Sequence, residues 1–308
     1  MAEINETTTS LPQDVMTYYE RVFLKRAEYA MILKEGAQMR THSKFSGKTI
    51  NFTRYNPLTI NATALSEASF PSPSTISAST VSVTLAEYGQ TVITSKMHEL
   101  VSIDANMKEQ IELVGQNMGE VLNRVTRVAM DSATIYFPNS RNISTVTTAD
   151  TLNACACRGM TQTLEIAKAQ PYKDGFWIGK TNPQSKYTLL GDSTWINAKT
   201  YSDVKDLYKG EMGELYQIRW LLNKDVASAN GNAGAAACST VLYYSYVHGT
   251  DAFGCYDLEG DQPKLYILTN HSDSVDVTGR RSYVAWAGAY ATTLLNSSWL
   301  LTGKFTAA

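Results

Sequence analysis

Apolar residues recur every three or four positions between residues 104 and 136, and this is the longest regular pattern in the chain. The pattern predicts one amphipathic helix, because steps of three and four place apolar side chains along a single stripe. Asp104 is a suitable N-cap and Pro138 would close the far end. A helix of roughly thirty residues is about 45 Å long, at about 1.5 Å per residue. The stripe contains Met107, Ile111, Val114, Met118, Val121, Leu122, Val125 and Val128.

Two packing arrangements fit this helix. Several stripe positions also follow a seven-residue repeat, which is typical of a coiled-coil arm. The segments on either side alternate like strands and do not continue the repeat. We therefore favour a single spine helix laid across a sheet.

Residues 48–55 and 81–93 alternate between apolar and polar positions, which predicts two strands, each with one face exposed to solvent. Residues 56–80 lie between them, contain three prolines and carry a single charge, Glu67. A two-stranded hairpin is marginal in water, so an extended β-hairpin loop of this kind should lie on something else. The alternative is an ordinary surface loop.

The remaining patterns are mixed. Helical spacing covers residues 12–39, 150–169 and 194–207. Short strands are predicted at 177–179, 187–190, 217–222, 241–247, 255–258, 265–268, 282–287 and 299–305. Because the strands and helices are not arranged as repeated strand-helix-strand units, the fold class is α+β.

Composition favours burial against other subunits. Of the 308 residues, 44% are hydrophobic and only 18% are charged, against roughly 25% charged in ordinary soluble proteins. A net charge of -2 without a basic cluster argues against tight nucleic-acid binding. The sequence contains no apolar run long enough for a membrane span and no signal-peptide pattern, so we expect synthesis in a cytoplasm.

The sequence contains no recognisable motif for a catalytic, metal or cofactor site. Gly47-Lys48-Thr49 and Gly179-Lys180-Thr181 end like phosphate-binding loops, but His42 and Asp174 stand where each loop needs its first glycine. Cys155 and Cys157 are too close together for a zinc knuckle, and four cysteines make no disulfide framework. The histidines are isolated and are interpreted as structural or surface residues: His42, His98, His248 and His271.

Several short motifs, in this order and spacing, resemble the major capsid proteins of tailed bacteriophages, and within them the N4-type capsid family. They include Gly47-Lys48-Thr49-Ile50, Arg54-Tyr55-Asn56-Pro57-Leu58, Gly210-Glu211-Met212-Gly213 and Arg280-Arg281-Ser282-Tyr283. The sequence departs from the family pattern at Ala287-Gly288, where a lysine is expected.

The resemblance implies an HK97-like capsid fold. Residues 1–45 would form the N-terminal arm and 56–80 the extended loop. Residues 46–138 and the closing strands 277–308 would form the peripheral domain with its spine helix, and 139–276 the axial domain. The candidate subunit-interface residues are Arg54, Pro57, Glu67, Pro71, Glu211, Arg280 and Arg281.

The implied function is that of a major capsid protein, which needs self-complementary surfaces and no enzyme activity. The expected assembly is a homo-oligomer of hexamers and pentamers, forming an icosahedral shell that contains double-stranded DNA non-specifically. Scaffold, portal and cement proteins are candidate partners; no cofactor and no membrane are expected, and the location is the virion. The alternatives are an encapsulin-like compartment shell and a hydrolase without a recognisable motif.

Overall fold

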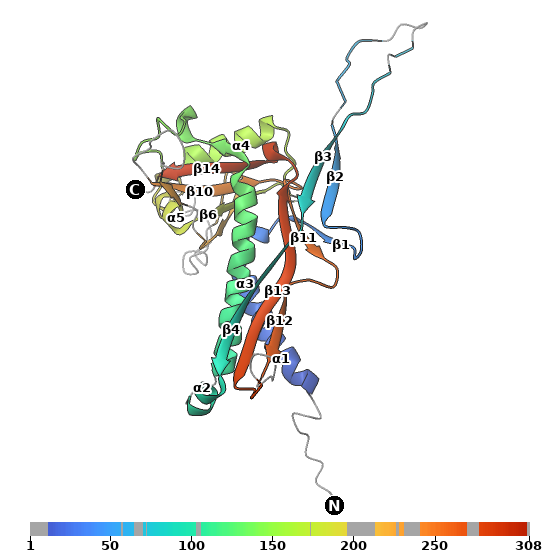
Figure 1. Cartoon of the computed structure of the whole chain (residues 1–308). Helices are drawn as coiled ribbons and strands as arrows, with labels where there is room; N and C mark the ends of the chain where they lie inside the picture. The colour runs from blue at the N-terminus through green and yellow to red at the C-terminus, as the bar shows by residue number, and fades with distance from the viewer. Residues whose placement is uncertain are drawn as a thin grey trace, which may run out of the picture.

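Two β-sheets with a long helix beside them form the body of the molecule (Figure 1). The computed structural model describes residues 12–56, 58–64, 70–71, 73–102, 106–172, 174–195, 213–225, 228–230, 241–269 and 277–306. Its helices are α1 (Pro12–Ala30), α2 (Lys96–Val101), α3 (Asn106–Asp131), α4 (Ala154–Ile166) and α5 (Pro183–Leu190), with short 3-10 turns η1 (Ile32–Lys34), η2 (Pro138–Ser140) and η3 (Ser297–Trp299).

The first sheet is built around the long strand β13 (Arg281–Leu294). Its order is β1 (Gln38–His42), β11 (Phe253–Leu258), β13 and β12 (Lys264–Leu268), and β4 (Ala86–Ser95) also pairs with β13. The second sheet has the order β5 (Thr134–Tyr136), β14 (Leu300–Thr306), β10 (Val241–His248), β6 (Trp177–Thr181), β8 (Ile218–Leu222) and β7 (Glu214–Leu215), with β9 (Ser228–Asn230) on β10. Each sheet has its own hydrophobic core.

Helix α3 is the predicted spine. Its apolar stripe faces β13 and α1 of the same chain, and Ile111, Val114, Met118 and Leu122 are buried there. The coiled-coil alternative is therefore wrong for this stripe, since the chain itself covers these residues; Val128 near the end of the helix is 61% exposed. The helix is also shorter than predicted: it ends at Asp131 because Thr134–Tyr136 pairs as a parallel strand with β14. Asp104 lies outside the described residues.

Helix α1 lies against the spine at two glycines. A Cβ on Gly115 would lie 2.7 Å from the carbonyl oxygen of Phe23, and a Cβ on Gly119 would lie 2.6 Å from that of Ala27. Only hydrogen atoms fit at these positions, so the glycines let the two helix backbones approach closely. The predicted helix 12–39 is thus divided, because the chain turns at η1 and enters the sheet as β1.

Residues 187–190 are a helix, and the strand prediction there is wrong. Asn182 caps α5 by accepting a hydrogen bond from Ser185 N at 2.7 Å, and Pro183 occupies the first turn. Both features favour a helix start. The predicted helix 194–207 falls almost entirely outside the described residues.

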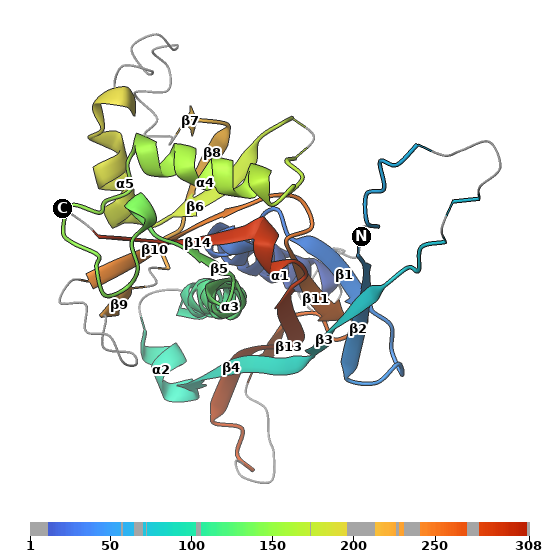
Figure 2. The same ribbon diagram turned by 90° about the horizontal axis from the view of Figure 1, so that it is seen from above.

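The predicted hairpin is present. Strands β2 (Thr49–Tyr55) and β3 (Ala78–Thr84) pair from Thr49 opposite Thr84 to Tyr55 opposite Ala78. At its root Phe52 stacks on Tyr256, with ring centroids 4.6 Å apart. Beyond the paired strands, the loop projects far from the body (Figures 1 and 2), and its described residues are exposed.

Each sheet draws strands from both sides of residue 276: β11 and β12 join β13 in the first sheet, while β10 joins β14 in the second. The division into arm, peripheral and axial domains stays a prediction.

The glycines beneath α1 give a testable prediction. Gly→Ala in a helix interior ordinarily stabilises by about 0.5–1 kcal/mol. We expect the opposite sign for Gly119→Ala, a loss of about 1–3 kcal/mol, because the new methyl group would overlap the Ala27 carbonyl. Urea unfolding of the protein measures it, with the exposed-site variant Lys108→Ala on the same helix as control. A stabilised Gly119→Ala protein would contradict the observed helix spacing.

Candidate functional site

The surface at the root of the hairpin contains a groove of about 650 Å³ between β1, β2 and the turns near residues 168, 251 and 296. The Arg54 guanidinium lies 5.9 Å from the centroid of the Trp299 ring, and that of Arg40 lies 5.3 Å from the Phe52 ring. Asn296 is buried, and its Nδ2 has no hydrogen-bond partner within the described part of the chain. Tryptophan and arginine are enriched at interface hot spots. The predicted residue Arg54 therefore lies in a groove with the composition of a protein-protein contact.

Arg280 and Arg281 lie elsewhere, at the start of β13 beside the end of β4. Lys96 N donates to Arg280 O at 2.7 Å, and Arg281 is opposite Ser95 in the register. Both arginines are exposed. Figure 1 shows the start of β13 at the far end of the molecule from β2. The structure thus separates these two arginines from Arg54.

Of the other predicted interface residues, the structure describes only Pro71. Pro71 is exposed in the extended loop. Pro57, Glu67 and Glu211 lie outside the described residues. Among the described candidates, Arg54 therefore lies apart from Arg280 and Arg281, and the role of each residue at an interface stays a prediction.

Sequence reasoning missed an exposed apolar cluster at the end of β4 and on α2. Ile93, Met97, Leu100 and Val101 are between 57% and 73% exposed. Clustered exposed apolar residues are typical of surfaces that contact another protein. The sequence contained a sign of this cluster, because three apolar residues occur within six positions, 96–101. A helix of only six residues is too short to bury them all against the rest of the chain.

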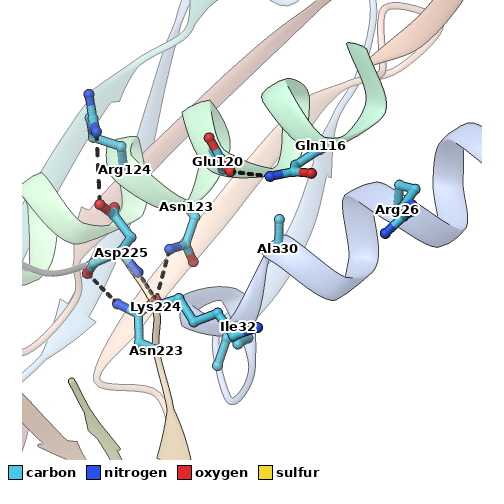
Figure 3. Close-up of a pocket in the computed structure, with 10 residues that line it drawn as sticks. All are labelled: Arg26, Ala30, Ile32, Gln116, Glu120, Asn123, Arg124, Asn223, Lys224 and Asp225. Atoms are coloured by element: carbon cyan, nitrogen blue, oxygen red, sulfur yellow. Dashed lines mark hydrogen bonds and ion pairs between the residues drawn. The ribbon is translucent and has the colours of Figure 1, made fainter. Parts of the chain in front are cut away.

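A second pocket, of about 460 Å³, lies where α1, α3 and the segment after β8 meet (Figure 3). Its polar groups bond one another: Asn123 Nδ2 donates to Asn223 Oδ1 at 3.1 Å, and Arg124 lies 3.9 Å from Asp225. Arg127, deeper in the same junction, donates to Asp225 Oδ1 at 3.0 Å. We interpret this pocket as a structural junction of α1, α3 and the second sheet.

A buried lysine holds the turn between α1 and β1. Lys180 on β6 is fully buried; its Nζ donates to the carbonyl oxygens of Leu33 at 2.8 Å and Glu35 at 2.6 Å. The same Nζ lies 4.7 Å from the centroid of the Phe253 ring. Tyr172 OH donates to Gly36 O at 2.6 Å. We call Lys180, Tyr172 and the neighbouring His248 the Lys180 clamp.

Burial sets the electrostatics of this clamp. It lowers the pKa of Lys180 to about 7, because the charged amine loses its hydration. The pKa of His248 is lowered well below its ordinary range, first by burial and then by the nearby Lys180 charge. His248 Nδ1 lies 3.1 Å from Gly249 O and 3.3 Å from Tyr172 OH. The interpretation of His248 as a structural residue agrees with this position.

From the sequence, Lys180 stood out only as part of Gly179-Lys180-Thr181, an incomplete phosphate-binding motif. The residue lies in a strand that is buried on both faces, so its amine contacts carbonyl oxygens and not solvent. The described residues contain no cluster of histidine, cysteine, aspartate or glutamate able to hold a metal ion. Among them, no helix combines the length and the apolar character needed to cross a membrane.

Comparisons with known proteins identify the fold. No protein-family model and no curated protein matches the sequence. Among solved structures, the capsid of Ralstonia phage GP4 matches with a TM-score of 0.68 at 12% identity, over 88% of this chain and 87% of that one. The cyanophage Pam1 capsid asymmetric unit matches with a TM-score of 0.64 at 15% identity, over 100% of both chains. The head structure of Helicobacter pylori bacteriophage KHP40 matches with a TM-score of 0.64 at 12% identity, over 87% of both.

The chain therefore adopts an α+β fold of the HK97-like capsid type, as predicted. The N4-type subfamily stays a prediction, because none of these matches tests it.

The Lys180 clamp predicts a pH dependence of stability. The unfolded chain protonates Lys180 below its ordinary pKa of 10.5, whereas the folded chain does so only below about 7. The unfolded state thus binds more protons between pH 7 and 10.5, and stability should rise across this window by up to about 1.4 kcal/mol per pH unit. His248 acts at lower pH: its depressed folded pKa makes stability fall as pH drops below 6.5.

The measurement compares urea unfolding of the wild type and Lys180→Met from pH 7 to 10. We expect the rise to disappear in Lys180→Met and to persist in Lys48→Met, where the lysine is exposed. Equal slopes in the wild type and Lys180→Met would refute the assignment of a neutral buried amine.

Proposed function

We propose that this chain is a major capsid protein, which assembles with copies of itself into the icosahedral head of a tailed bacteriophage and encloses its double-stranded DNA. The fold supports this proposal, because it matches capsid subunits along almost their whole length. A subunit of this kind acts through its surfaces and needs no catalytic group, so we propose a structural and not an enzymatic role.

The extended loop is the observation that carries the proposal. Leu58, Ile60, Phe70 and Ile76 are 56%, 83%, 97% and 72% exposed. Apolar side chains on a protruding loop are unfavourable in water, at about 25 cal/mol for each square ångström that could be buried. A neighbouring copy is the economical partner, since repeated head-to-tail contacts close into rings.

The other surfaces fit the same assembly. In this proposal the apolar cluster on β4 and α2, the groove at Arg54 and the pair Arg280 and Arg281 contact neighbouring copies. Glu67 would meet a basic residue of another subunit, because charge pairs fix register. Residues 139–276 would contact their copies around the fivefold and sixfold centres.

The proposed setting follows from this role. The chain would be made in the cytoplasm of the host bacterium and would reside in the virion. A scaffold, a portal and cement proteins are candidate partners, and DNA would be held by enclosure without sequence preference.

Electron microscopy of the native particle and of the chain expressed alone tests the proposal. DNA-filled shells in the native particle support it. Shells filled with protein would favour the encapsulin-like alternative, and dispersed subunits from both sources would contradict assembly.

Shortening the loop should separate folding from assembly. Asn56 N donates to Ser77 O at 2.9 Å, so these residues are already opposite each other. Replacing residues 57–76 by Asn-Gly gives a tight hairpin turn. We expect thermal unfolding close to that of the wild type, because β2 and β3 keep their pairing, but no shells by electron microscopy. Normal shells from this variant would show that the loop is not an assembly contact.

The charge balance predicts weak DNA binding by the free subunit. The chain has 27 basic and 29 acidic residues, and each neutralised phosphate adds a salt-dependent term to affinity. Retardation of a short duplex in a native gel should be slight at low salt and lost at physiological salt, whatever the DNA sequence. Tight binding that persists at physiological salt would reveal a nucleic-acid site.

A further inference from the structure

Strand β4 has an open edge along its whole length. It pairs with β13 on one side, and no other strand of the described chain pairs with its second side. The strand has ten residues, Ala-Glu-Tyr-Gly-Gln-Thr-Val-Ile-Thr-Ser.

The register shows which backbone groups face outward. Lys96 N donates to Arg280 O at 2.7 Å, directly beyond the pair formed by Ser95 and Arg281. Hydrogen-bonded and non-bonded pairs alternate in an antiparallel ladder, so the even-numbered residues of β4 bond to β13. On the far side of β13, Ala289 N donates to Asp261 O, which fits the same alternation. The residues whose amides and carbonyls point away from the sheet are Glu87, Gly89, Thr91, Ile93 and Ser95.

This edge lacks the usual protection. Natural edge strands are guarded by lysine, by proline or by a bulge. β4 has neither lysine nor proline, and its single charge, Glu87, lies near one end. Its ten residues pair with β13 without an interruption in the register. An edge of this length and regularity is a template for another strand.

One leg of the extended loop has the complementary character. Residues 58–64 read Leu-Thr-Ile-Asn-Ala-Thr-Ala, which alternates between apolar and polar positions with the period of a strand. All seven are exposed and none is paired in a sheet. The opposite leg contains Pro71 and Pro73, which have no amide to donate. The leg 58–64 is thus a strand-like segment without a sheet.

The leg cannot reach the β4 edge of its own chain. β3 continues through Leu85 into β4, so the loop and β4 lie at opposite ends of β3 (Figures 1 and 2). Ala86 lies eight positions after Ala78 in the chain, which is about 26 Å at about 3.3 Å per residue. Folding the leg back over that distance would break the pairing of β2 with β3.

We propose that residues 58–64 of one copy add as a strand to the β4 edge of a neighbouring copy. This inference rests on the proposed function, since it requires subunits side by side. Each copy donates one leg and offers one edge, so the contact is heterologous and can repeat around a ring. Main-chain bonds supply the affinity in this mode of recognition, and the exposed side chain of Ile93, a residue of β4 itself, would contact the apolar face of the leg.

Hydrogen exchange at single-residue resolution tests the proposal, by comparing free subunits with assembled shells. Even-numbered amides of β4 should exchange slowly in both. The odd-numbered amides Glu87, Thr91 and Ile93 should exchange rapidly in the free subunit and slow by about tenfold or more in the shell. If shells form and these amides stay fast, the strand addition is refuted while the capsid function stands. If no shells form from any source, the proposed function itself fails.

Proline variants identify the occupant. Adjacent residues of a strand direct their amides to opposite sides, so either Thr59→Pro or Ile60→Pro removes a bond to β4. We expect one of them to restore rapid exchange at Thr91 or to prevent assembly. The matched control is Ile76→Pro, an equally exposed position on the opposite leg. Protection of Thr91 that survives both variants in the first leg would assign the edge to another segment and overturn the proposal.

Discussion

The structure depends on one helix that must bury two faces. Helix α3 packs against β13 on one side and against α1 on the other. Apolar packing alone would tolerate small shifts along the helix axis, because leucine, valine and methionine contacts are not directional. Three polar side chains on α3 remove that freedom. Asn117 Oδ1 accepts from Trp286 Nε1 at 3.0 Å, Asn123 Oδ1 accepts from Leu33 N at 2.9 Å, and Thr126 lies 3.0 Å from Tyr290 OH.

Buried polar groups also join the second sheet to the spine and to the turn after α1. Tyr246 of β10 donates to Asp131 at 2.6 Å at the end of the spine, and Lys180 of β6 holds the turn that follows α1. A buried amine without a partner costs several kcal/mol, and here two carbonyl oxygens and an aromatic face replace its water. Moving α1 or its turn would leave this amine unsatisfied. The connection therefore resists sliding more strongly than an apolar contact of the same size.

The sequence predicted the elements whose pattern is long and local. The stripe of α3, the alternation of β2 and the α+β class follow from periodicity, and the structure contains them. It did not predict where tertiary contacts override local signals. The spine ends early because Thr134–Tyr136 is captured by β14, a strand more than 160 residues away. Residues 187–190 look like a strand until the cap at Asn182 is considered, and the role of Lys180 depends on the turn at residues 33–36, which no local pattern connects to β6.

The distribution of packing and exposed apolar surface within the chain suits the proposed assembly. Packing and buried hydrogen bonds concentrate along α3, β13 and the Lys180 clamp, whereas two groups of exposed apolar residues lie on the extended loop and at the end of β4. A well-packed centre lies between these two surfaces, so in the proposed assembly a contact formed at one end would help to set the position of the other. Because the exposed surfaces gain most when covered, their free energy contributes to association and little to folding of the isolated chain. A subunit built in this way can fold first and assemble afterwards, with the same geometry repeated in each copy.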